Sequence, residues 1–129
     1  MRKPSQAEVL TQLLDAYRQE ARLYAGIERA AIEQFDILQN GRDPARLAEL
    51  TERQRTLSEL IGKIESGIQP VRQHWEQVRD SLEGPRCRRL ASQLDRLLDR
   101  LADQIHTVVE IERENSNALF TEAIGGVPE

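Results

Sequence analysis

Aromatic residues are scarce in this 129-residue sequence: they make up 4% of it, against 31% charged and 39% hydrophobic residues. This balance is typical of helical bundles and coiled coils, and it argues against sandwiches, barrels and nucleotide-binding α/β sheets. The length fits one domain, and no internal linker divides it. The sequence therefore predicts a single all-α domain covering residues 1–129.

Cysteine pairs, long apolar runs and a basic surplus are also missing. Cys87 is the only cysteine, so the chain cannot form an internal disulfide. Apolar runs reach only two or three residues, too short for a membrane span or a signal peptide. A net charge of −4 disfavours binding to nucleic acid. We expect a cytoplasmic protein that neither spans a membrane nor binds nucleic acid.

A first helix is expected over residues 5–39. Ser5-Gln6-Ala7-Glu8 has the spacing of a capping box, and Asn40-Gly41 supplies residues typical of a helix end. Glu20 and Gln34 interrupt its apolar seam, so we expect loose packing of this helix. The seam residues are Leu10, Leu13, Tyr17, Tyr24, Ile27, Ala31 and Leu38.

A second helix is expected over residues 44–83, with Asp43 as its N-cap and Pro44 in its first turn. It carries the most regular seam of the chain, with alternating steps of three and four residues and one polar break. Pro70 removes an amide donor, which predicts a bent but continuous helix. The seam residues are Leu47, Leu50, Gln54, Leu57, Ile61, Ile64, Ile68, Val71, Trp75, Val78 and Leu82.

A third helix is expected over residues 86–123, after Gly84-Pro85, and the tail 124–129 is expected to be disordered. Short connections force neighbouring helices to run antiparallel. The predicted architecture is an elongated antiparallel three-helix bundle, or coiled coil. A dimer that completes a larger bundle stays open.

A search for catalytic or metal-binding patterns finds little. The nearest metal pattern is one Asp103-x-x-His106 pair, and His74 has no acid at chelating distance in the sequence, so no metal or cofactor is expected. Cys87 lies among Arg86, Arg88 and Arg89, but no base or glycine-rich loop accompanies it.

We interpret Cys87 as lying in a solvated basic turn whose arginines pair locally with Glu83, Asp95 and Asp99. Trp75 is on the seam, which favours core packing over a ligand platform. The sequence indicates a protein that is not an enzyme.

The last predicted helix has a wide apolar surface. Two adjoining stripes cover more than half of its circumference, whereas a helix of a three-helix bundle usually buries one stripe of rather more than about 100°. Spare apolar surface near a chain end is typical of a protein-binding site. Packing by the first loop or by a dimer partner is the alternative.

Two stretches resemble the FlgN-type flagellar export chaperones. Residues 40–50 (NGRDPARLAEL), followed by Gln54 and Leu57, resemble that family's short loop before a Leu-x-x-Leu and a polar residue. Residues 110–119 (EIERENSNAL) resemble its C-terminal pattern of asparagine followed by leucine. Residues 105–108 depart from the family, which often has another asparagine there.

The resemblance implies a cytosolic secretion chaperone that binds the terminal helices of hook-associated flagellar proteins and keeps them unpolymerised. The partner-binding residues carried over by position, with a neighbouring phenylalanine, are Val108, Ile111, Asn115, Leu119 and Phe120. The alternative is a constitutive dimeric coiled-coil scaffold or adaptor, in which the same surface is a permanent self-interface.

Overall fold

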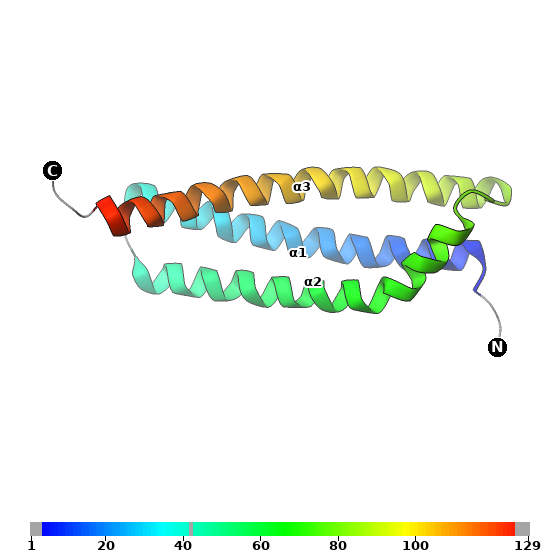
Figure 1. Cartoon of the computed structure of the whole chain (residues 1–129), viewed down its shortest axis with the longest axis horizontal. Helices are drawn as coiled ribbons and strands as arrows, with labels where there is room; N and C mark the ends of the chain where they lie inside the picture. The colour runs from blue at the N-terminus through cyan, green and yellow to red at the C-terminus, as the bar shows by residue number, and fades with distance from the viewer. Residues whose placement is uncertain (1–3, 42, 126–129) are drawn as a thin grey trace.

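The computed structural model describes residues 4–41 and 43–125, which form three long helices. These are α1 (Gln6–Asn40), α2 (Pro44–Val78) and α3 (Gly84–Gly125), and the described residues include no strand. Figure 1 shows an elongated bundle in which α2 runs opposite to both α1 and α3. The predicted all-α three-helix architecture is confirmed.

The first two helices begin where their capping residues predict. The hydroxyl oxygen of Ser5 accepts a hydrogen bond of 3.1 Å from the amide of Glu8. The Oδ1 atom of Asp43 accepts one of 3.1 Å from the amide of Arg46, and Pro44 occupies the first turn. These starts follow from local sequence because a cap satisfies amides within its own first turn.

The second helix ends at Val78 rather than at residue 83, and the side chain of Gln6 explains the difference. Its Nε2 atom donates to the carbonyl oxygen of Ser81 at 2.8 Å, and its Oε1 atom accepts from the amide of Glu83 at 2.9 Å. Gln6 therefore provides a donor for the Ser81 carbonyl and an acceptor for the Glu83 amide. A continued helix could not supply the donor, because the residue four positions after Ser81 is Pro85, which has no amide hydrogen. Nothing in the local sequence of residues 79–83 indicates this contact.

The third helix is longer than expected at both ends. Gly84 has a φ of 85°, in the left-handed region that favours glycine, and α3 continues to Gly125. Ile124 and Gly125 of the expected tail are thus helical. The remainder of that tail, residues 126–129, lies outside the described residues.

The first helix lies between the other two, as Figure 1 shows. Among the described residues, α1 packs against both α2 and α3, whereas no Cα atom of α2 lies within 8 Å of one of α3. As a result α1 buries eleven side chains and α2 only three, namely Leu50, Ile61 and Trp75. The prediction of loose packing around α1 was wrong.

The regular seam of α2 is mostly half-buried, because in the described part of the chain only the backbone of α1 lies close to it. Of its seam residues, Leu50, Ile61 and Trp75 are buried, whereas Leu57 and Ile64 are only partly so. A regular heptad seam predicts that a helix packs against another helix, but it does not indicate how many helices cover the seam. The half-buried members are Leu47, Gln54, Leu57, Ile64, Ile68, Val71, Val78 and Leu82.

The predicted bend at Pro70 is confirmed. The helix is continuous from Pro44 to Val78, with Pro70 inside it, and Figure 1 shows α2 turning toward α3 in this part of its length. Beyond the bend, Trp75 joins an apolar cluster that also contains Leu13 of α1 and Leu94 of α3. The bend therefore closes the bundle at the end where α3 begins.

Cys87 belongs to this same cluster and is 9% exposed. The interpretation of a solvated basic turn was wrong for the thiol, although Arg86, Arg88 and Arg89 are exposed. A cysteine on the inner stripe of a helix behaves as a small apolar side chain. Core packing of Trp75 is confirmed by the same cluster.

Candidate functional site

The inner face of α3 is a stripe of buried residues spaced seven apart. Each is at most 9% exposed, and the stripe faces α1. Val108 packs with Ile27 of α1 and Ile61 of α2 in a small second core. The stripe consists of Cys87, Leu94, Leu101, Val108 and Asn115. Two predicted partner-binding residues, Val108 and Asn115, therefore lie inside the bundle.

Asn115 is a buried polar residue at the α1–α3 contact and is 5% exposed. Its Nδ2 atom donates a hydrogen bond of 2.9 Å to the carbonyl oxygen of Ala31 in α1. Its Oδ1 atom is buried without a hydrogen-bond partner in the described part of the chain. Asn115 thus holds α3 at one position along α1, at the cost of one unsatisfied acceptor.

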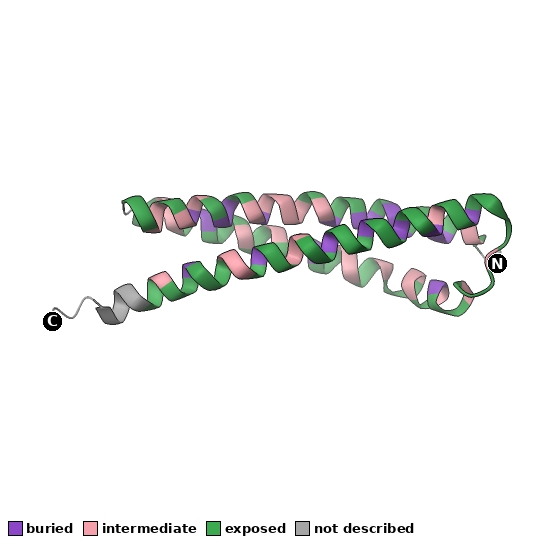
Figure 2. Ribbon diagram, turned by 90° about the horizontal axis from the view of Figure 1, so that it is seen from above, coloured by how far each residue is buried: buried purple, intermediate pink, exposed green. Residues whose placement is uncertain are grey.

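Beyond Asn115, the large apolar side chains of α3 whose burial the structure describes are exposed, with Leu119 at 49% and Phe120 at 65%. Ile111, which precedes Asn115, is half-buried. Figure 2 shows the reason, because the C-terminal part of α3 diverges there from the hairpin of α1 and α2. Leu119 and Phe120 form what we call the terminal apolar surface.

Further exposed apolar residues lie outside this pair. Val109 on α3 is 43% exposed. Ile32 on α1 is 46% exposed and Leu60 on α2 is 40% exposed. Neither Ile32 nor Leu60 lies on a predicted seam, so their exposure agrees with the sequence pattern.

The charges that precede the terminal apolar surface are mostly acidic. Glu110, Glu112 and Glu114 alternate along α3, and Arg113 forms an ion pair of 3.3 Å with Glu110. Burial raises the pKa of the Glu112 carboxyl above its usual value. A partner that lies along this part of α3 would meet apolar side chains flanked by carboxylates.

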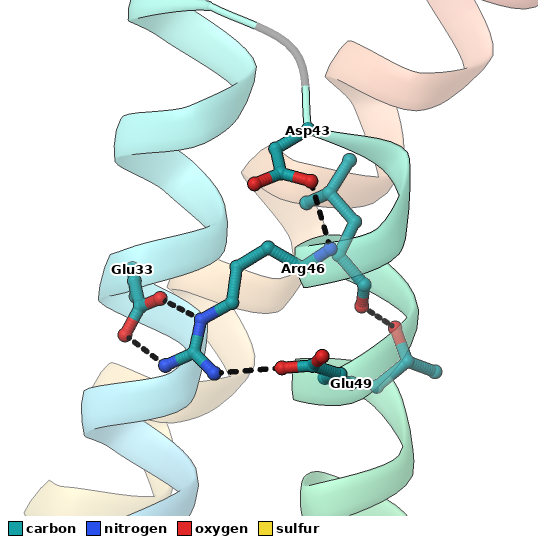
Figure 3. Close-up of polar contacts among 6 residues, drawn as sticks. Glu33, Asp43, Arg46 and Glu49 are labelled. Atoms are coloured by element: carbon teal, nitrogen blue, oxygen red, sulfur yellow. Dashed lines mark hydrogen bonds and ion pairs between the residues drawn. The ribbon is translucent and has the colours of Figure 1, made fainter.

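The first stretch behind the chaperone resemblance contains the hairpin between α1 and α2, and its side chains Asp43, Arg46 and Glu49 are paired within the chain. Figure 3 shows Arg46 bridging Glu33 of α1 and Glu49 of its own helix. Two of these hydrogen bonds are 3.0 Å long, and the guanidinium Nε also pairs with Glu33. Leu50 beside them is fully buried. These contacts show that residues in this stretch stabilise the connection between α1 and α2.

Groups that could support chemistry are dispersed. No cluster of three or more His, Cys, Asp or Glu side chains able to hold a metal occurs among the described residues. His106 is exposed and His74 is half-buried. The arginines 86, 88 and 89 form no ion pair with Glu83, Asp95 or Asp99 within the described part of the chain, so the expected local pairing is not formed.

Comparisons with protein-family models, with curated proteins and with solved structures find no match to this chain. The resemblance to FlgN-type chaperones therefore depends on the two sequence stretches alone. Within the described residues, no helix has the length and apolarity needed to cross a membrane.

Proposed function

We propose that this protein is a non-enzymatic, helix-binding protein of the secretion-chaperone type, whose partner lies on the C-terminal part of α3. The observation that supports the proposal is the terminal apolar surface, where Leu119 and Phe120 are exposed on a diverging helix end. The resemblance names the partners: terminal helices of hook-associated flagellar proteins, held unpolymerised in the cytoplasm.

The physical basis is the packing of an amphipathic helix on an apolar surface. Leu119 and Phe120 are next to each other in the sequence, and α1 leaves both largely uncovered. A partner helix with apolar residues three and four positions apart could cover both side chains while its polar face stays in water. Val108 and Asn115 would act indirectly in this arrangement, by holding α3 on α1.

The test measures binding of a synthetic peptide that contains the C-terminal helix of a hook-associated protein from the same organism. We expect Leu119→Arg and Phe120→Asp to weaken binding about thirtyfold, because each places a charge in a desolvated contact worth about 2 kcal/mol. Their melting temperatures should stay close to that of the parent protein. Equal binding by parent and variants would refute the proposal.

Two controls separate surface from core. Leu60→Arg changes a side chain of α2 that is 40% exposed and should leave binding unchanged. Leu50→Ala removes a fully buried side chain and should cost about 2–5 kcal/mol of unfolding free energy. If Leu119→Arg destabilises the fold as strongly as Leu50→Ala, the terminal surface is part of the core.

The second candidate is a constitutive dimeric scaffold, and the half-buried seam of α2 favours it. A seam of this regularity could pack against a second copy on the side that α1 leaves open. Light scattering coupled to size-exclusion chromatography decides between the two. A dimer that persists on dilution and is dissociated by Ile64→Glu, with no peptide binding, would favour the scaffold.

A further inference from the structure

A buried carboxyl group lies at the contact between α1 and α2. Glu20 of α1 is 2% exposed, and its Oε2 atom has no hydrogen-bond partner among the described residues. The carboxyl of Glu65 on α2 lies within hydrogen-bonding reach of Glu20. Two carboxyl groups can form a hydrogen bond only if one of them carries a proton.

The surroundings of Glu20 favour the protonated form. Burial, the hydrogen bond with Glu65 and the charge of Glu65 together raise the pKa of Glu20 from 4.5 to about 8, against the lowering effect of Arg72. Burial is the largest cause, because an ionised carboxylate loses its hydration there. The lowering effect of Arg72, which also forms an ion pair with Glu65, is the smallest of these causes.

The groups around this pair come from two helices. Tyr17 and Tyr24 flank Glu20 on α1, and burial raises the pKa of both phenols, so they stay neutral at moderately alkaline pH. Glu65 and Arg72 face Glu20 from α2. Leu101 and Ile105 of α3 pack in the apolar cluster that contains the two tyrosines. Among the described residues, α3 contributes no charged group that shifts the pKa of Glu20.

The pair lies close to the Pro70 bend of α2. Glu65 precedes Pro70 and Arg72 follows it, so their ion pair bridges the bend. Pro70 has no amide to donate to the helical ladder, and the helix is easier to open there. The segment beyond the bend, residues 71–78, carries Trp75 and depends on side-chain packing to stay on α1 and α3.

We propose that the Glu20–Glu65 carboxyl pair is a pH-dependent latch. One shared proton keeps α2 packed on α1 at the Pro70 bend, and loss of that proton loosens the segment that carries Trp75. Without the proton, the carboxylates of Glu20 and Glu65 repel each other, and the Glu20 carboxylate is buried, so water cannot fully hydrate it. This inference concerns the α1–α2 contact and does not depend on the partner of α3.

The direction of the pH effect follows from proton linkage. Between the unfolded pKa of 4.5 and the folded pKa of about 8, the folded protein holds a proton that the unfolded chain has lost. The stabilisation by this proton is complete below the lower value and is lost as the pH rises through the upper one. The unfolding equilibrium constant should therefore rise up to about tenfold per pH unit across this window.

Trp75 is a natural probe, since it is the only tryptophan and is 9% exposed. The experiment records its emission maximum in the folded protein from about pH 5 to about pH 9, with urea unfolding at each pH. Cys87 belongs to the same apolar cluster as Trp75, so all proteins carry Cys87→Ala to keep the thiol from affecting the fluorescence. We expect a shift to longer wavelength as the pH rises.

Glu20→Gln should abolish this shift and the associated rise of the unfolding constant, because glutamine keeps the shape of the protonated acid. Glu65→Gln should move the midpoint to lower pH, since it removes the neighbouring charge and supplies an amide donor. Glu59→Gln, at an exposed position of α2, should behave like the parent protein. A parent protein without a shift, or a shift unchanged in both Glu20→Gln and Glu65→Gln, would overturn the proposal.

Discussion

The side-chain amide of Asn115 on α3 donates a 2.9 Å hydrogen bond to the backbone carbonyl oxygen of Ala31 on α1, in a contact where Asn115 is 5% exposed. Asn115 follows Val108 by seven residues on the inner stripe of α3. A single asparagine on such a stripe selects one register of neighbouring helices and lowers their stability. The bond therefore aligns α3 on α1 just before the terminal apolar surface begins.

Two substitutions of Asn115 test how this residue affects the stability of the folded protein. We expect Asn115→Leu to be at least as stable as the parent protein, because it removes a buried Oδ1 atom that lacks a partner. Asn115→Asp should lose about 2 kcal/mol or more, since it places a carboxylate beside the Ala31 carbonyl. Urea unfolding measures both, and a leucine variant less stable than the aspartate variant would contradict this account.

Two glycines inside helices should respond oppositely to alanine. A Cβ atom at Gly62 would meet nothing within 4 Å, so Gly62→Ala should raise the unfolding free energy by about 0.5–1 kcal/mol through helix propensity. At Gly26 the same atom would lie 3.0 Å from the Cδ1 atom of Leu57 and would force it to move. We expect no gain there. Thermal melting of the two variants checks the difference.

The Arg46–Glu33 pair should contribute to stability in a pH-dependent way. The hydrogen bond from Arg46 is the main cause that lowers the pKa of Glu33 below 4.5. The stabilisation is therefore present above that value and lost as the pH falls through the lower folded pKa.

The expected result is that Arg46→Ala melts below the parent protein at neutral pH, and that the difference shrinks in acid. Lys63→Ala, at an exposed position of α2 that does not shift the pKa of Glu33, is the control. A difference that persists in strong acid would show that lost packing of the arginine side chain causes it.

The side-chain amide of Gln6 should stabilise the connection between α2 and α3. Gln6→Glu keeps an acceptor for the Glu83 amide but loses the donor to the Ser81 carbonyl. We expect faster hydrogen exchange of the backbone in residues 79–83, with little change in the middle of α1. Gln12→Glu, an exposed site on the same helix, is the matched control. Unchanged exchange in the Gln6 variant would show that the connection is stable without this contact.

Much of the fold follows from local sequence rules. Ser5, Asp43 and Pro44 specify where helices begin, because a capping side chain and a fixed φ act within one turn. Pro70 specifies the bend, since the missing amide acts on its own helix. These features hold whatever the helix packs against.

The candidate site was less predictable. The sequence indicated a wide apolar surface near the end of α3, and Leu119 and Phe120 are indeed exposed. It did not tell that Val108 and Asn115 face α1. Helical periodicity groups residues by face, but which face meets a neighbour depends on how the neighbours are arranged.

The sequence by itself therefore determined the helical class, the starts of the first two helices and the bend at Pro70, because each depends on atoms within a few residues of each other. Only the tertiary structure decided that α1 is the central helix, that Cys87 is buried and that Glu20 meets Glu65. These outcomes depend on contacts between residues far apart in the chain. The free energy of such contacts comes from burial and desolvation, which the order of residues along one helix does not specify.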